Sequence, residues 1–258
     1  MSAEKDISLE EKRVYAAKQD ATDVFVATGA GLARVTVSAD LVGEFGLEYR
    51  GPCVDVTATG RVAIATPEDV LLAGEDGFVE TGFGPASAVS YGEEGLVAAG
   101  DGRVATREEG DWTTLAEIDD VRAIDGDLVA AKGGVFRLDG THVGLSAVND
   151  IAVGEEIWAA TDDGLYWLGN GWMDALEGEF TAVATAGDRV HAATAETLYE
   201  RADGEWREVE APAGIVDVGY GDAVYAVTES GTFLADAGDG FRDRLLGLPD
   251  VRALSPLV

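Results

Sequence analysis

The sequence contains little cysteine, histidine or proline, and each shortage excludes a class of protein. The single cysteine, Cys53, cannot form an internal disulfide, and two histidines, His142 and His191, are too few for a His-rich metal site. With six prolines and no Pro-rich or Gly/Ser-rich linker, the sequence indicates no internal domain boundary. No apolar run approaches the roughly 18 residues of a membrane span, and the N-terminus lacks the apolar core of a signal peptide. We therefore expect a cytoplasmic protein without membrane contact.

Basic residues are also scarce, and the charge balance is strongly acidic. Asp and Glu number 49 against 18 Lys and Arg, which gives a formal net charge of −31. Such a chain repels itself at low salt, whereas at molar salt the Debye length falls to about 3 Å and the repulsion is screened. The composition favours a halophile's protein; an acidic protein from ordinary salt that binds cationic partners is the alternative. The absence of a basic stripe argues against nucleic acid as a partner.

The sequence does contain one short motif, which is repeated seven times. Each copy has a first strand that ends at an equivalent position, occupied in turn by Thr28, Thr66, Gly100, Lys132, Thr161, Thr194 and Thr228. The mean spacing of these positions is about 33 residues, a period typical of solenoids, propellers and arrays. Within a copy, apolar residues alternate at period 2, and no copy contains the 3.6-residue period of a helix.

Four strand-like runs make up each copy. Dipeptides such as Asp203-Gly204 and Asp239-Gly240 supply the positive φ angles of hairpin turns, and most copies continue with an aromatic residue: Phe78, Trp112, Trp172, Trp206 or Phe241. Four antiparallel strands repeated radially form a propeller blade. The sequence therefore predicts an all-β, seven-bladed β-propeller of four-stranded antiparallel blades. It forms a single domain over residues 1–258, with residues 1–11 as a flexible N-terminal segment.

Two columns of residues are expected to form the core. Small residues recur one position before the end of the first strand, where neighbouring blades crowd near the axis: Ala27, Ala65, Ala99, Ala131, Ala160, Ala193 and Val227. The aromatic column is expected to pack between blades further out.

Ring closure has two candidate segments. Residues 250–255, DVRALS, repeat the inner-strand text DVRAID of residues 120–125, so the C-terminus is expected to supply the inner strand of the first blade. Residues 13–18, RVYAAK, are also strand-like, and they either compete for that place or form the outer strand of the last blade.

Aligned inner strands predict a candidate ligand site in the central channel. Asp55, Asp150 and Asp217 fall at one level of the ring, and Arg122, Arg252 and Asn149 fall one residue away, on the opposite strand face. The aspartates could bind a polar ligand or, through their oxygens, a divalent cation; whether they bind a metal is left open. The alternative, which we favour, is that these side chains bond to the backbone and fill the axis.

One face of the ring is expected to carry the turns that follow each repeated strand. These turns are acidic, with Glu68, Asp69, Asp101, Asp162, Asp163, Glu196 and Glu229. The same face is expected to expose Tyr49, Arg50, Phe83 and Phe180. Exposed aromatic side chains among acids are a candidate docking site for a protein partner, and replacing Phe83 and Phe180 with Ser should then leave the fold intact.

Motifs for catalysis or cofactor binding are missing. There is no P-loop, GxSxG, HExxH or EF-hand sequence, and the TGAG at residues 28–31 continues as a strand where a dinucleotide fold needs a helix. We therefore expect no cofactor, and we regard an enzyme as the less favoured class.

The phrases ATDDGLYWLGNGW at residues 160–172 and VHAATAETLYERADGEW at 190–206 resemble blades of the ligand-binding sensor propellers of two-component regulators. The whole chain, with its opening EKRVYAAK and acidic composition, looks like an uncharacterised haloarchaeal β-propeller family. This resemblance implies the fold and supplies no catalytic residues.

Three functions follow from these observations. The first is a noncatalytic binding platform for a protein partner in a halophile cytoplasm. A small-molecule sensor binding at the channel mouth is the second, and a hydrolase or lyase using the channel carboxylates is the third. Fold alone does not decide among them.

Overall fold

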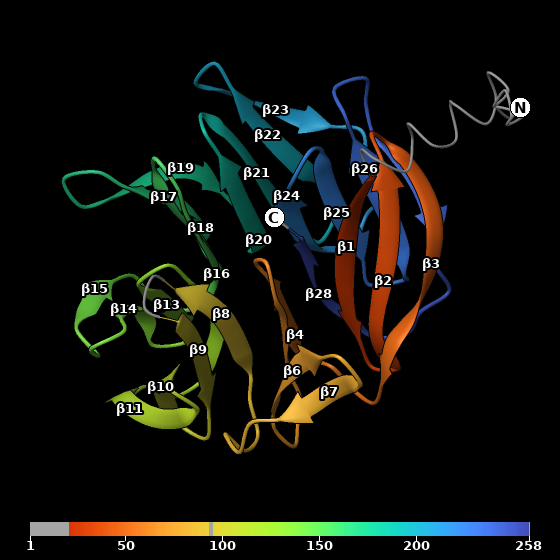
Figure 1. The fold of residues 1–258 in the computed structure, drawn as a ribbon. Helices are drawn as coiled ribbons and strands as arrows, with labels where there is room; N and C mark the ends of the chain where they lie inside the picture. The colour runs from red at the N-terminus through yellow and green to blue at the C-terminus, as the bar shows by residue number, and fades with distance from the viewer. Residues whose placement is uncertain (1–20, 93–94, 258) are drawn as a thin grey trace, which may run out of the picture.

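The computed structural model describes residues 21–92 and 95–257, and this part of the chain is built of strands. It forms seven four-stranded antiparallel sheets arranged radially around a central axis (Figure 1). The predicted seven-bladed β-propeller is therefore confirmed. No helix in residues 21–92 or 95–257 is long and apolar enough to span a membrane.

From the axis outward, the strands of the first three blades follow the order of the chain, except that the C-terminal strand β28 is the innermost strand of blade 1. Blade 1 contains β28 (Val251–Pro256), β1 (Ala21–Thr28), β2 (Gly31–Ser38) and β3 (Leu41–Arg50). Blade 2 contains β4 (Asp55–Ala58), β5 (Val62–Ala65), β6 (Val70–Gly74) and β7 (Gly77–Glu80). Blade 3 contains β8 (Ala88–Gly92), β9 (Gly95–Gly100), β10 (Arg103–Glu108) and β11 (Asp111–Glu117).

The remaining four blades repeat this order from the axis outward. Blade 4 contains β12 (Val121–Asp125), β13 (Leu128–Ala131), β14 (Gly134–Arg137) and β15 (His142–Gly144). Blade 5 contains β16 (Val148–Val153), β17 (Ile157–Thr161), β18 (Gly164–Leu168) and β19 (Trp172–Glu177). Blade 6 contains β20 (Phe180–Ala186), β21 (Arg189–Thr194), β22 (Leu198–Ala202) and β23 (Glu205–Val209). Blade 7 contains β24 (Ile215–Tyr220), β25 (Val224–Thr228), β26 (Thr232–Asp236) and β27 (Arg242–Leu245).

The C-terminal strand closes the ring. β28 pairs antiparallel with β1, so that Val26 lies opposite Leu254 and Phe25 opposite Ser255. β28 is thereby the inner strand of blade 1, which confirms the expectation drawn from DVRALS. Residues 13–18, the competing segment, and residues 1–11 lie outside the described residues.

Both predicted columns lie in the core. The small residues of the first column are fully or almost fully buried, and they allow adjacent blades to approach closely near the axis. The aromatic column packs, partly buried, against hydrophobic clusters further out; for example, Trp112 contacts the cluster that contains Phe83, and Trp206 the cluster that contains Trp158. Large side chains are accommodated there because the blades diverge from the axis.

In five blades, a threonine organises the turn that follows the second strand from the axis. This strand is the one described above as the first strand of each sequence copy. The Thr161 hydroxyl donates to the Gly164 carbonyl at 2.8 Å and accepts from the Asp163 and Gly164 amides. Such bonds satisfy turn groups that the strand ladder leaves unpaired. Blade 3 departs from this pattern because a Cβ at Gly100 would lie 2.0 Å from the Pro85 carbonyl oxygen, so only glycine fits there.

Candidate functional site

The three predicted channel aspartates line one cavity of about 280 Å³ around the axis. Each carboxylate accepts two backbone hydrogen bonds, one from the next residue of its own strand and one from the inner strand of the following blade. For Asp150, Oδ1 accepts from the Ile151 amide and Oδ2 from the Val183 amide, each at 2.8 Å. The side chain therefore links blade 5 to blade 6.

The same arrangement recurs at the other two aspartates. Asp55 accepts from the Val56 and Val89 amides, and Asp217 accepts from the Val218 and Leu254 amides, at distances of 2.7–2.8 Å. The Asp217 bond joins blade 7 to the C-terminal strand of blade 1. We call these bridging side chains inter-blade clasps.

Two further side chains make clasps that the sequence analysis did not identify. Asp125 accepts from the Val153 amide at 2.7 Å and Ser255 accepts from the Ala58 amide at 3.0 Å. Asp125 lies at the end of its strand rather than at the level of Asp150. The signal for it was the DVRALS and DVRAID alignment, which places Asp125 and Ser255 at equivalent positions.

Burial of these carboxyls shifts their pKa values upward. Burial raises the pKa of Asp55 to about 6 and that of Asp150 to about 7, although the amide bonds act in the opposite direction. The pKa of Asp217 is raised by burial and then by the charge of Asp150, and burial also raises that of Asp125. Burial therefore brings the pKa values of Asp55 and Asp150 close to neutral pH.

The channel carboxylates are not arranged as a metal site. Within residues 21–92 and 95–257, no group of three or more His, Cys, Asp or Glu side chains could hold a metal ion. The oxygens that would coordinate a cation are directed at backbone amides. What the arrangement does chemically is to hold neighbouring blades together.

The second predicted set lies away from this cavity. The Arg122 guanidinium bonds to Asn149 Oδ1, and the Asn149 amide group donates to Asp162 at 2.9 Å and to the Phe180 carbonyl at 2.8 Å. Arg252 is exposed, without a recorded ion pair to a described residue. The structure thus brings Arg122 and Asn149 together at the junction of blades 4, 5 and 6.

The expectation that Phe83 and Phe180 are exposed is wrong. Phe180 has 0% exposure and Phe83 is also buried. Each packs into a core cluster: Phe83 from the connection between blades 2 and 3, and Phe180 as the first residue of the inner strand β20. Tyr49 is partly buried and lies edge-on to Phe78 at 5.6 Å, whereas Arg50 is exposed. Of the four predicted docking residues, only Arg50 is presented to solvent as expected.

Asp69, expected among the exposed acids, is also buried. Its carboxylate accepts from the amides of Val70, Gly82, Phe83 and Gly84, at 2.7–3.1 Å. Burial would raise the pKa of Asp69, but the four N–H groups together hold it below its usual value. Asp69 therefore shapes the loop that carries Phe83 into the core.

His191, on β21, is a buried packing residue. Its Nδ1 lies 2.5 Å from the Tyr220 hydroxyl, and its ring packs near Phe241. Burial lowers the pKa of His191 to about 4, so the imidazole is neutral at pH 7. The neighbouring Glu200 bonds to Arg189 and Arg207.

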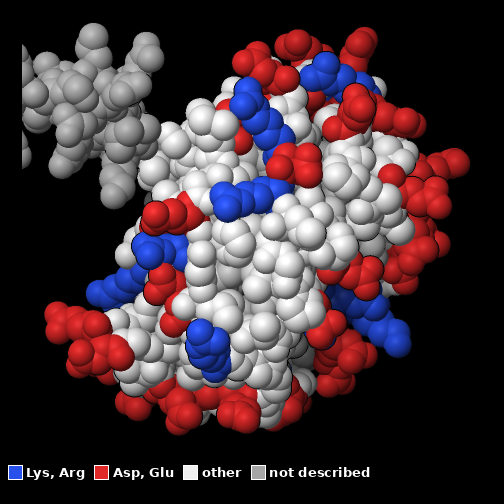
Figure 2. Space-filling model, turned by 90° about the vertical axis from the view of Figure 1, so that its right-hand side faces the viewer, with Lys and Arg blue, Asp and Glu red and all other residues white. Residues whose placement is uncertain are grey.

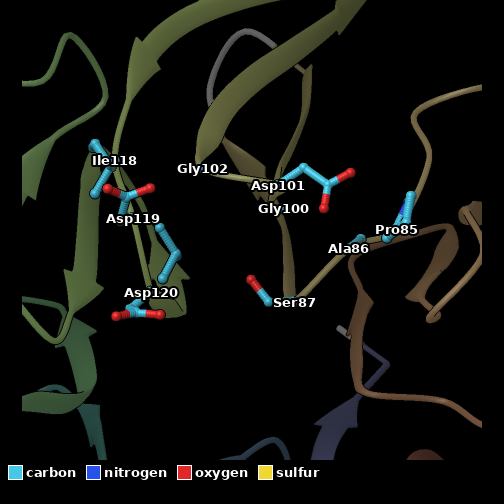
Figure 3. Close-up of a pocket in the computed structure, with 10 residues that line it drawn as sticks. Pro85, Ala86, Ser87, Gly100, Asp101, Gly102, Ile118, Asp119 and Asp120 are labelled. Carbon is cyan, nitrogen blue, oxygen red and sulfur yellow. The ribbon is translucent and has the colours of Figure 1, made fainter.

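An open cleft of about 420 Å³ separates blades 3 and 4 on the face that carries the acidic turns. Its walls include Pro85, Ser87 and Gly100 on one side and Ile118 and Asp120 on the other. Figure 3 shows the side chains of Asp101, Asp119 and Asp120 around the opening. All three are exposed and form no recorded ion pair with a described residue. No side-chain clasp joins blades 3 and 4 among the described residues, and the two blades pack through a shared hydrophobic cluster that contains Ala99 and Ala131.

Comparison with known proteins identifies the family. A model of the family described as HVO_0234-like β-propeller matches residues 8–256. The chain belongs to this family. A search of curated proteins finds no match.

Similar solved structures share the family's fold. They include PorZ, a surface component of the type-IX secretion system of Porphyromonas gingivalis, with 14% identity and a TM-score of 0.59 over 79% of this chain and 34% of PorZ. A chain of the nidogen/laminin complex has 11% identity and a TM-score of 0.58, over 92% of this chain and 98% of that one. The extracellular domain of BT4673, a putative one component system from B. thetaiotaomicron, has 11% identity and a TM-score of 0.60, over 86% of this chain and 37% of that one. This chain thus spans about a third of the length of two of these neighbours, and identities this low show the fold alone.

Proposed function

We propose that this propeller is a noncatalytic platform that binds a protein partner in a high-salt cytoplasm. The observation that carries this proposal is the use of the channel carboxylates as inter-blade clasps. Their oxygens accept hydrogen bonds from backbone amides, so these carboxylates stabilise the fold and are not free to bind a ligand. The surface left for recognition is the face with the acidic turns.

On that face, the cleft between blades 3 and 4 brings several exposed carboxylates together. Its free carboxylates, Asp101, Asp119 and Asp120, surround a partly apolar depression containing Ile118. A partner with Lys or Arg side chains beside an apolar residue would complement this arrangement. The nidogen/laminin neighbour comes from a complex of two proteins, which is consistent with a platform role without identifying a partner.

The test is affinity purification from a halophilic host in molar KCl, with quantitative mass spectrometry. A triple variant, D101N/D119N/D120N, should reduce recovery of a stoichiometric partner. The matched control, D203N/E205Q/E208Q, removes three exposed charges from the outer part of blade 6 and should recover the partner as wild type does. Equal recovery by both variants would show that the cleft is not the binding site, and the absence of any stoichiometric partner would contradict the platform.

A small-molecule sensor is the second candidate function. It is favoured by the channel cavity, which is lined by Asp55, Asp125, Thr185 and Tyr220, and by the likeness to the BT4673 domain. Thermal-shift screening with small polar ligands tests it, with D150N as a control that alters the cavity. A hydrolase or lyase has less support because the required carboxylates are bonded to amides.

A further inference from the structure

Arginine is scarce in this acidic protein, and most of the described arginines have a bonding partner. Seven of them form ion pairs with Asp or Glu, and Arg103 and Arg244 donate to backbone carbonyls. Figure 2 shows this pattern on one side of the molecule, where acidic side chains far outnumber basic ones and most basic ones lie beside an acidic one. Four arginines have no ion pair or side-chain hydrogen bond recorded with a described residue: Arg50, Arg61, Arg107 and Arg252.

Two of these four, Arg61 and Arg107, face the same junction, which lies between blades 2 and 3. Arg107 of β10 lies opposite Leu96 of β9, and Leu96 lies opposite Tyr91 of β8. Directly opposed residues of antiparallel strands point to the same face of a sheet. Leu96 packs into a cluster that also contains Ala63 of blade 2. Arg107 and Tyr91 therefore lie on the face of blade 3 that meets blade 2.

Arg61 reaches this junction from blade 2. It immediately precedes β5 and lies two positions before Ala63, and side chains two positions apart along a strand share a face. The Asp55 clasp to the Val89 amide holds β4 beside β8 at the axis (Figure 1). The turn from β4 to β5 is at the opposite end of β5 from Thr66 and its acidic turn. Arg61 therefore lies on the other face of the ring from the cleft between blades 3 and 4.

The polar groups at this junction act on one another and keep free donors. Burial raises the pKa of Tyr91, and the positive charges of Arg61 and Arg107 act on it in the opposite direction, so both charges lie within reach of the Tyr91 hydroxyl. That hydroxyl has no hydrogen bond recorded with residues 21–92 or 95–257, and Arg107 Nε is buried without a partner among them. A buried donor without an acceptor is costly, and like charges repel. A bound anion would relieve both effects.

We propose that Arg61, Tyr91 and Arg107 form a binding site for a phosphate group at the junction of blades 2 and 3. Guanidinium groups present forked N–H donors that match the oxygens of phosphate, and the tyrosine hydroxyl adds one more donor. Two positive charges balance the dianion of inorganic phosphate or of a phosphate monoester, whereas a single carboxylate would leave one of them unneutralised. The ligand is therefore phosphate, either free or carried by a small molecule.

The net charge of −31 does not prevent this binding at high salt. At molar KCl the Debye length is about 3 Å, so the carboxylates elsewhere on the surface repel a bound anion only weakly. Contacts at hydrogen-bond distance persist under these conditions. Chloride is then in large excess, and an anion displaces it only by accepting several hydrogen bonds at once. Binding at molar KCl therefore reports the site itself and not a general attraction of anions to arginine.

Isothermal titration calorimetry of the full chain in molar KCl tests the proposal, with inorganic phosphate and glycerol 3-phosphate as probes. The wild type should bind at least one of them at a single site. R61Q and R107Q should each lower the affinity about tenfold, and R61Q/R107Q should abolish binding, because each loses a charge-assisted contact. Y91F should have a smaller effect. The matched control is R50Q/R252Q, which removes two arginines that also lack a recorded partner among the described residues and should bind as the wild type does.

A wild type that binds neither probe would overturn the proposal, and so would equal affinities of R61Q/R107Q and R50Q/R252Q. If the R61Q/R107Q variant alone loses binding, tighter binding of glycerol 3-phosphate by the wild type assigns the site to a monoester, and tighter binding of phosphate assigns it to the free anion. Circular dichroism establishes that each variant is folded. Should R107Q fail to fold, R61Q carries the test, because Arg61 is exposed. Wild-type affinity in R61Q would then refute the site.

Discussion

The inter-blade clasps predict an unusual pH dependence of stability, which is best tested at Asp150. Burial raises the pKa of this carboxyl to about 7, against about 3.9 for aspartate in an unfolded chain. Between these values the folded state binds a proton that the unfolded state has released. The contribution of Asp150 to the free energy of unfolding is therefore fully present at low pH and is lost as pH rises through about 7.

The size of the effect follows from this pKa difference. From pH 5 to pH 8, linkage gives a loss of roughly 3 kcal/mol from this carboxyl. In D150N the side chain does not titrate, so its contribution is constant. The variant also loses an acceptor for one of the two amides, which costs about 1–3 kcal/mol. The destabilisation of D150N relative to wild type should therefore be large at pH 5 and smaller by roughly 3 kcal/mol at pH 8.

The assay is urea denaturation in fixed molar KCl, followed by tryptophan fluorescence at several pH values. D188N is the control, because it removes one negative charge from an exposed turn of blade 6. It should follow the wild-type pH dependence, including any general effect of net charge. If D150N also follows the wild-type curve, Asp150 does not bind a proton in this range and the argument from burial is refuted.

Three other predictions concern the scaffold. D69A should lower the free energy of unfolding by about 3–5 kcal/mol in urea titrations, because four amides lose their acceptor; a change below about 1 kcal/mol would contradict that role. F180S should cost about 3–5 kcal/mol because the ring is buried, while M173S, at a site 47% exposed, should cost little; similar melting temperatures for the two would refute the burial of Phe180. T161A should cost about 1 kcal/mol by removing the turn bonds, and T161S should recover most of it; failure of serine to do so would assign the loss to the methyl group.

Much of the fold was predictable because each blade is a local unit. The period-2 alternation of apolar residues and the turn dipeptides lie within one repeat of about 33 residues. Seven copies of this repeat therefore indicate seven blades. The small and aromatic columns were predictable for the same reason, since equivalent positions in a repeat occupy equivalent environments.

The candidate site was only partly predictable. Aligning the inner strands placed Asp55, Asp150 and Asp217 together, and they do line one cavity. The amides that donate to them could not be found from the alignment, because each bond comes from the backbone of the next blade, some 33 residues away. Phe83 was misplaced for a related reason: it lies on a connection between blades, which has no periodicity, so its side chain follows the packing of two blades. Phe180 was misplaced because β20 begins at this residue, one position before the strand that the alignment predicted.

The sequence by itself determined the strands and their number, because local propensity and repetition act along the chain, and it offered the C-terminal strand as one of two candidates for closing the ring. Only the tertiary structure decided which segment closes the ring, which polar groups face amides, which aromatic side chains are buried and where a cleft lies between blades. Those outcomes depend on contacts between neighbouring blades. Such contacts exist only once the ring has closed and the inner strands have been brought side by side around the axis.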